Sequence, residues 1–207
     1  MHYKEVILDD YIDSFQKSHR IVYGNLLRIQ FCLEFLETAN DKLIQPTSLY
    51  WYLLELVEHE WEYLILLLQR CLFDTVGNAY TLNSFISEVR NKYIRPEYRD
   101  YINELIRMSL WQSSDIKGLK NEIKPILYAF RTHIAHTLNE DLVADALELK
   151  KIRSLYEAAR DMFQRLSFEP NDFYLSAEGD GHTFDETEMR KMTREFFDAC
   201  ITVRINE

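Results

Sequence analysis

The sequence predicts an all-α fold, an antiparallel helical bundle of about six to seven helices, and three observations support this prediction. Only 5 Gly and 4 Pro interrupt 207 residues, whereas an all-β sandwich or a doubly wound α/β fold needs many more turn residues. Apolar residues recur at helical spacing in every long segment. The hydrophobic content of 47% is enough for one substantial core, so we expect a single helical domain over residues 1–207.

The first expected helix covers residues 8–39 and carries a heptad seam. His19 fills one gap in a 4-3-4-3 progression of about four repeats. The apolar members of this seam are Leu8, Ile12, Phe15, Val22, Leu26, Ile29, Leu33 and Leu36. Such a seam suits packing within a bundle and also a helix-mediated dimer, in which we expect His19 to be a hydrogen-bonded interface residue.

The bundle core is expected over approximately residues 45–166. Pro46 and the residues after it open a helix that is apolar on most of its circumference to about Phe73, which indicates a central place in the bundle. Thr81 can then cap a shorter helix that ends near Tyr93.

Three further helices complete this core. The first covers about 96–111, with a proline in its first turn. The second covers about 113–137, where Gly118 and Pro125 predict a late start or a kink. The third covers 142–166, because apolar residues alternate there at spacings of three and four.

The C-terminal part is expected to contain a loop and one more helix. Residues 167–182 hold one Pro and two Gly with few apolar residues in register, which predicts a long exposed loop. Thr183 and Glu186 form a capping-box pattern, so we expect a helix over 183–201.

Charge and cysteine content restrict the classes of function. The 34 Asp and Glu exceed the 24 Lys and Arg, and the net charge of −10 repels polyanions, so any nucleic-acid contact must be local. Acidic residues interrupt the most apolar stretch, 49–72, which argues against a membrane span. The N-terminus lacks a signal-peptide pattern and the three Cys form no CxxC pair, so we expect a cytoplasmic protein.

Arg131 and His136 form an Arg-x4-His pair late in the 113–137 helix. These two residue types can carry out acid–base chemistry on a phosphate. A guanidinium can clamp a phosphate with two hydrogen bonds, and an imidazole can exchange a proton near neutral pH. Together these groups suffice for metal-independent RNA cleavage. The alternative is that both residues only stabilise the helix C-terminus through its dipole.

In this helical context the sequence resembles the HEPN superfamily, and within it the AbiU2-like group. The resemblance is carried by Phe130–Thr132 and Ala135–Thr137, and more loosely by Leu66–Asp74 with the following Thr81. It implies a HEPN-like bundle over about residues 45–165 and a metal-independent endoribonuclease of a toxin–antitoxin or phage-defence system. It also implies a homodimer whose protomers together form the cleft lined by the motif Arg and His.

The chain departs from the family pattern at two positions, and the angle between its two motif residues restricts how a site can form. Thr132 stands where members usually carry Asn, Asp or His, and Leu138 stands where some carry Tyr. Five residues of α-helix place Arg131 and His136 roughly 140° apart. This offset fits a site built from two chains or from a distorted helix end.

Four residues are candidates for a supporting role at this site. Thr132 keeps a hydrogen-bonding group next to Arg131, and His133 is a second acid–base candidate or an exposed packing residue. Arg70 and Asp74 are spaced i, i+4 on an apolar helix, so we expect them to pair with each other. In the functional alternative, Arg70 faces the cleft and Asp74 orients a motif side chain.

Three lysines precede the motif on the same expected helix. Lys117, Lys120 and Lys124 follow one face toward Arg131 and could contact an RNA backbone, although a solvated face explains them equally well. A second basic group surrounds Pro96 and carries the same ambiguity; its members are Arg90, Lys92, Arg95 and Arg99.

We expect no metal and no cofactor. His133 and His136 are spaced i, i+3, and Glu58 and Glu60 flank His59, but nothing in the sequence pairs these segments into a metal site.

The function expected from these observations is a HEPN-like endoribonuclease that binds RNA as a homodimer and has an antitoxin or other protein partner. The alternative is a catalytically silent HEPN-like dimer that binds a protein or a nucleotide. A metal-dependent helical-bundle enzyme is the third hypothesis.

Overall fold

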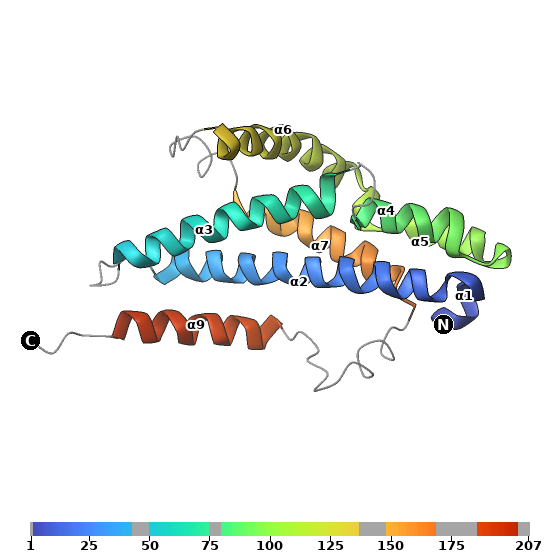
Figure 1. The fold of residues 1–207 in the computed structure, drawn as a ribbon, viewed down its shortest axis with the longest axis horizontal. Helices are drawn as coiled ribbons and strands as arrows, with labels where there is room; N and C mark the ends of the chain where they lie inside the picture. The colour runs from blue at the N-terminus through green and yellow to red at the C-terminus, as the bar shows by residue number, and fades with distance from the viewer. Residues whose placement is uncertain (1, 43–49, 75–79, 137–147, 169–185, 203–207) are drawn as a thin grey trace, which may run out of the picture.

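The computed structural model describes residues 2–42, 50–74, 80–136, 148–168 and 186–202. Only the backbone is described at residues 42, 50, 131–136, 186–188 and 201–202. The chain is an all-α helical bundle, as predicted (Figure 1). Within the described residues no strand forms, and the only β-type contact is an isolated antiparallel bridge between Ile7 and Ile94.

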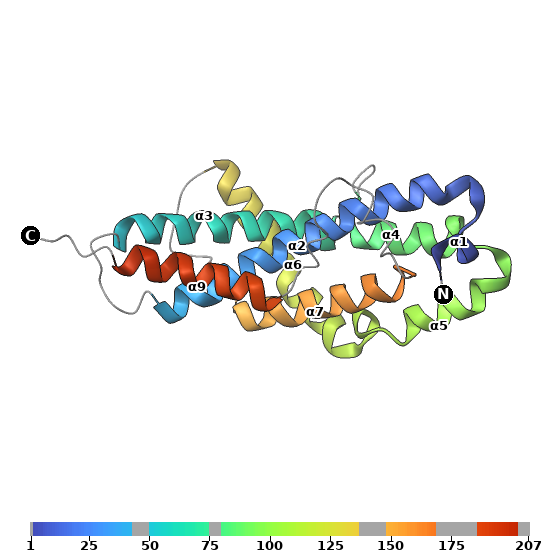
Figure 2. The same cartoon turned by 90° about the horizontal axis from the view of Figure 1, so that it is seen from below.

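The long helix α2 (Ile12–Lys42) lies in the middle of the bundle, with α3 on one side and α9 on the other (Figures 1 and 2). The heptad prediction for this segment is confirmed from Phe15 onward, since every later member of the seam, from Val22 to Leu36, is buried. The predicted start at Leu8 is wrong. A short helix α1 (Tyr3–Val6) and a 3₁₀ turn (Asp9–Tyr11) precede α2 instead.

His19 is buried inside the chain's own core, which corrects its expected place at an interface. Its Nε2 atom lies 2.8 Å from Ser167 Oγ, and Phe163 and Phe85 flank the ring. The one proton of the Ser167 hydroxyl is donated to the Phe163 carbonyl oxygen, so His19 Nε2 donates to Ser167. Burial lowers the pKa of His19 to about 3, which keeps the ring neutral.

Helix α3 (Tyr50–Leu68) continues into a π turn, η2 (Gln69–Phe73), and the predicted start at Pro46 lies outside the described residues. The helix buries only one side, so the expectation that it occupies a central place in the bundle is wrong. Its exposed side presents large apolar residues, namely Trp51, Tyr52, Tyr63 and Leu66.

Helix α4 (Leu82–Glu88) starts as predicted, because Thr81 Oγ1 accepts a hydrogen bond from the backbone N–H of Ser84. A second π turn, η3 (Val89–Tyr93), follows α4. Arg95 is extended before Pro96, also as predicted. The segment from Pro96 then divides into three pieces: a 3₁₀ turn (Pro96–Tyr98), helix α5 (Arg99–Arg107) and a 3₁₀ turn, η5 (Leu110–Gln112).

Helix α6 (Ser114–His136) starts at the predicted position and contains Pro125. Helix α7 (Leu149–Arg165) starts later than the predicted 142, because Glu148 has extended backbone angles. Ser167 and Phe168 were expected in an exposed loop, but both are buried. The rest of that loop, residues 169–182, lies outside the described residues.

Helix α9 (Glu186–Thr202) is the last element, and Thr183 of the predicted capping box lies outside the described residues. A buried ion network fixes both α9 and α7 to α2. Glu34, only 2% exposed, accepts hydrogen bonds from Arg190 Nε at 2.7 Å and pairs with Arg153 at 2.9 Å. Arg153 also binds Glu37 at 2.7 Å.

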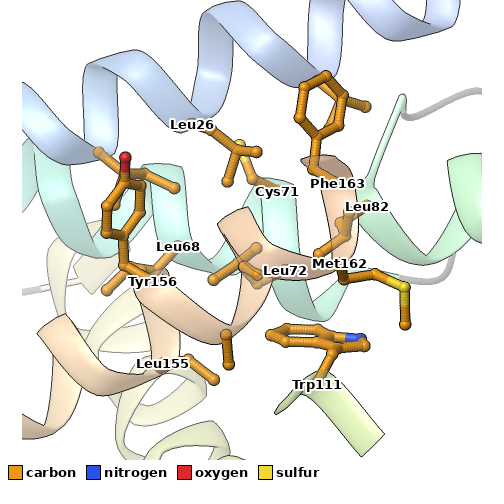
Figure 3. Packing of buried hydrophobic residues seen from close by; sticks show 14 of the residues in the cluster. Leu26, Leu68, Cys71, Leu72, Leu82, Trp111, Leu155, Tyr156, Met162 and Phe163 are labelled. Atoms are coloured by element: carbon orange, nitrogen blue, oxygen red, sulfur yellow. The ribbon is translucent and has the colours of Figure 1, made fainter. Parts of the chain in front are cut away.

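The apolar core joins α2, α3, α4, α6 and α7. Near its centre, Trp111 from η5 lies beside Leu72 and Met162 (Figure 3). Cys32 and Cys71 are buried thiols, and burial raises the pKa of Cys71 to about 12. None of the described helices is long and apolar enough to cross a membrane.

Candidate functional site

The Arg-x4-His motif lies in the last two turns of α6. The helix remains α-helical to His136 in the described backbone, so a distorted helix end does not bring positions 131 and 136 together. The side chains of Arg131, Thr132, His133 and His136 lie outside the described residues. By helical register, the two motif positions differ in direction by roughly 140°.

The π turn η2, which carries Arg70, packs against α6. Arg70 is exposed, and no ion pair joins it to Asp74 in the described part of the chain, so the predicted pairing is wrong. The reason is local. The π turn breaks the i, i+4 spacing, and Asp74 is its C-cap with an extended backbone (ψ 134°). The Asn83 side-chain amide secures the turn by donating to the Leu72 carbonyl at 3.0 Å.

Lys117 and Lys124 are exposed on α6, and neither forms an ion pair within the described residues. They are seven residues apart and therefore lie on nearly the same side of the helix. The Lys124 ammonium lies 5.8 Å from the centre of the Tyr128 ring. These two lysines, which we call the α6 lysine pair, form a local positive face on an acidic protein.

Lys120 does not share this face. Its Nζ lies 3.2 Å from the centre of the Trp111 ring and donates to the Trp111 carbonyl oxygen at 3.0 Å. Burial, together with the nearby charge of Lys117, lowers the pKa of Lys120 to about 8. The predicted three-lysine stripe is therefore reduced to two exposed members.

Three members of the basic group around Pro96 have structural contacts. Arg95 forms an ion pair with Asp9 at 2.7 Å and donates to the Ile7 carbonyl at 3.2 Å. Arg90 Nε donates to Asn103 at 2.8 Å, and the Lys92 ammonium lies 5.3 Å from the Tyr11 ring centre. These contacts hold the N-terminal segment and α5 in place.

The structure does not assemble the predicted alternative metal ligands within its described residues. No group of three His, Cys, Asp or Glu side chains suited to a metal ion occurs among them. His59 and Glu58 are exposed, whereas Glu60 points toward buried Cys32, whose pKa is raised by burial first and then by the Glu60 carboxylate.

The exposed aromatic side of α3 was not predicted from the sequence. Trp51 is 77% exposed and Tyr52 71% exposed, and Tyr63 and Leu66 continue the same side of the helix. Trp51, Tyr52, Tyr63 and Leu66 were visible in the sequence, but the apolar residues of this segment were interpreted as core. Comparisons of the chain with family models, curated proteins and solved structures found no match.

Proposed function

We propose that this protein is a HEPN-like, metal-independent endoribonuclease of a toxin–antitoxin or phage-defence type, acting in the cytoplasm. The observation that carries the proposal is the continuity of α6. One helix connects the Arg131 and His136 positions to the α6 lysine pair, and exposed Arg70 is on a turn packed against that helix. This arrangement supports the proposal because one helix carries both a local basic surface and the position of an acid–base residue, and RNA cleavage requires both.

In this mechanism Arg131 binds the scissile phosphate and His136 moves a proton. The guanidinium donates two parallel hydrogen bonds to phosphate oxygens and stabilises the charge that develops there. The imidazole either accepts the proton of the 2′-hydroxyl or donates one to the leaving oxygen. Lys117 and Lys124 contact neighbouring phosphates, and Thr132 and His133 are supporting residues.

The proposal includes a homodimer. A regular α-helix separates positions 131 and 136 by roughly 140°, so one copy of α6 does not direct both groups at a single phosphate. A second copy supplies the missing group if the two α6 C-termini meet across a two-fold axis. Sedimentation should then give about twice 24.9 kDa at micromolar concentration.

RNA cleavage in EDTA tests the proposal. Wild type should cut RNA, and His136→Ala should lower the rate by roughly a hundredfold to ten-thousandfold with little change in melting temperature. His59→Ala is a matched control, because His59 is exposed on α3 and has no role in the proposed site. Wild type that never cuts RNA would overturn the enzyme proposal.

Arg131→Lys separates binding from catalysis. The variant keeps the positive charge but loses the planar fork that holds two phosphate oxygens. We expect RNA binding to be partly retained while cleavage falls by roughly tenfold to a thousandfold. Melting temperature should be measured on the same samples. A large loss of stability with no effect on cleavage would mean that Arg131 is a structural cap.

The second candidate is a catalytically silent HEPN-like dimer that binds another protein. The adjacent Trp51 and Tyr52, 77% and 71% exposed at the start of α3, favour it, because aromatic residues are enriched at protein–protein contacts. Dimeric protein that binds RNA weakly, never cleaves it and stays dimeric when Trp51 and Tyr52 are replaced by serine would select this candidate, because the α3 side is then not used for self-association.

A further inference from the structure

A cavity of about 330 Å³ lies between α2 and the start of α4, on elements that the proposed RNA site does not use. Its volume is within the usual range for small-molecule sites. It is lined by Ser18 and Val22 from α2 and by five residues around α4, namely Tyr80, Thr81, Ser84, Phe85 and Glu88.

The Glu88 carboxylate is the charged group of this cavity, and only one of its oxygens is occupied. Tyr93 Oη donates to Glu88 Oε2 at 2.8 Å, and Ser18 Oγ donates to the same oxygen at 3.3 Å. No hydrogen bond or ion pair reaches Glu88 Oε1 from the residues that the structure describes. Burial first, and then the Glu88 carboxylate, raises the pKa of Tyr93 to about 12, so its hydroxyl stays a donor.

The other polar groups add acceptors. Thr81 donates its hydroxyl proton to Ser84 Oγ at 3.0 Å, while Thr81 Oγ1 accepts from the Ser84 backbone N–H. The protons of Ser18, Tyr93 and Thr81 are thus committed within the protein. A ligand can therefore donate hydrogen bonds to the lone pairs of these hydroxyl oxygens and to Glu88 Oε1. The cavity favours a ligand group that has several donors and a positive charge.

The apolar part of the cavity fits a short hydrocarbon body. Val22 and Phe85 line it with apolar groups, and both are otherwise packed into the core, 3% and 1% exposed. Tyr80 lies at the more open side, and the Lys17 ammonium already lies 5.7 Å from the centre of its ring.

We propose that this cavity binds a small aliphatic primary amine in its ammonium form, with the ammonium group on Glu88 Oε1 and the Ser18 hydroxyl and the alkyl chain against Val22 and Phe85. An ammonium group carries three donors and no acceptor, which matches the acceptors of this cavity. The net charge of −10 on the chain further favours a cationic ligand over an anionic one.

Calorimetric titration of the full chain with n-butylamine at neutral pH, compared with 1-butanol, tests the proposal. The two probes have nearly the same shape, but only butylammonium is charged and carries three donors. Wild type should bind butylammonium at least about tenfold more tightly than butanol, because a charge-assisted hydrogen bond contributes more than a neutral one.

Three variants locate the binding. Glu88→Gln keeps an oxygen to accept from Tyr93 and Ser18 but removes the charge, and should weaken butylammonium binding by about tenfold to a hundredfold. Ser84→Leu keeps the backbone N–H that caps onto Thr81 and fills the cavity, so it should abolish binding. Glu97→Gln makes the same charge change on the exposed 3₁₀ turn at Pro96–Tyr98 and should bind like wild type.

Three outcomes would overturn the proposal: no butylammonium binding by wild type, equal affinity for butanol, or equal loss in Glu97→Gln and Glu88→Gln. The last would mean that the acidic surface attracts amines in general. Melting curves on each variant show whether the fold is intact. If Glu88→Gln melts early, the Ser84→Leu titration still decides, because retained binding in that variant would place the amine elsewhere.

Discussion

Two groups of cations in this protein have opposite environments. At the junction of α2, α7 and α9, Arg153 is 13% exposed in its side chain and is shared between Glu34 and Glu37. On α6, Lys117 and Lys124 extend into solvent with no ion pair among the described residues. The first group was not visible as a unit in the sequence, because its members come from residues 34, 37, 153 and 190.

The difference shows which charges stabilise the fold and which are available to a ligand. A buried charge that has lost its partner is costly, so the Glu34 network cannot release its cations to bind RNA. An exposed lysine adds little to stability, and its counterions can be released to solution when it meets a phosphate. The predictions below test this division.

Replacing Glu34 by glutamine should give the largest effect. Arg153 would keep Glu37 but lose its most buried partner, and Arg190, 51% exposed, would lose the charge of Glu34. We expect the free energy of unfolding to fall by about 2–4 kcal/mol in urea denaturation. Glu37→Gln is the matched control on the same arginine. Glu37 is 37% exposed, so its loss should be smaller, at about 1 kcal/mol.

Acid should destabilise the protein through His19, which is buried and kept neutral in the folded chain. The unfolded chain takes up a proton on His19 near pH 6.5, but the folded chain does so only near pH 3, so stability falls as the pH drops from 6.5 toward 3. Between pH 7 and pH 5 the loss from this residue is about 2 kcal/mol.

The difference between wild type and His19→Gln in urea denaturation at the two pH values isolates this effect. Glutamine can still donate to Ser167 but does not titrate. A wild type and a His19→Gln variant with the same loss between pH 7 and pH 5 would contradict the prediction.

Removing the α6 lysine pair should change RNA affinity and leave stability alone. Each lost phosphate contact lowers the salt dependence of binding to single-stranded RNA by about 0.7, so Lys117→Gln combined with Lys124→Gln should lower the slope of log K against log salt by about 1.4. We expect affinity at low salt to fall about tenfold. The unfolding free energy should change by less than about 0.5 kcal/mol.

Lys120→Gln should have the smallest effect on RNA binding. It should lower stability and leave RNA binding unchanged, which is the reverse of the effect expected for the α6 lysine pair. Its ammonium is committed to the Trp111 ring and carbonyl, so the salt slope should stay at the wild-type value. Loss of the contact with the indole should cost about 1 kcal/mol of stability. A salt slope reduced as much as in a Lys124→Gln variant would show that Lys120 releases Trp111 to bind RNA.

The sequence could predict those features of the fold that depend on local patterns. The seam of α2, the Thr81 cap and the extended residue before Pro96 all follow from short-range spacing or from one residue type. The π turns η2 and η3 could not be predicted, because tertiary packing, and not composition, determines where a helix widens. The presence of η2 overturned the expected pairing of Arg70 with Asp74.

The candidate site was predictable only in part. The position of the motif at the end of α6 followed from the sequence, as did exposure of Lys117 and Lys124. The position of Lys120 on Trp111 did not, since the tight turn η5 brings the indole under α6. The roles of Arg131 and His136 remain predictions, because they depend on a resemblance and on side chains outside the described residues.

One backbone hydrogen bond sets a condition on how the chain folds during synthesis. The Tyr3 N–H donates to the carbonyl oxygen of Phe168, a residue with φ of 48°, at 3.1 Å. A ribosome that adds about 5–20 residues per second needs roughly 10–30 seconds to make the chain between these two partners. During this interval α2 has emerged without α7 and α9, and its apolar seam is accessible to chaperones and to neighbouring nascent chains.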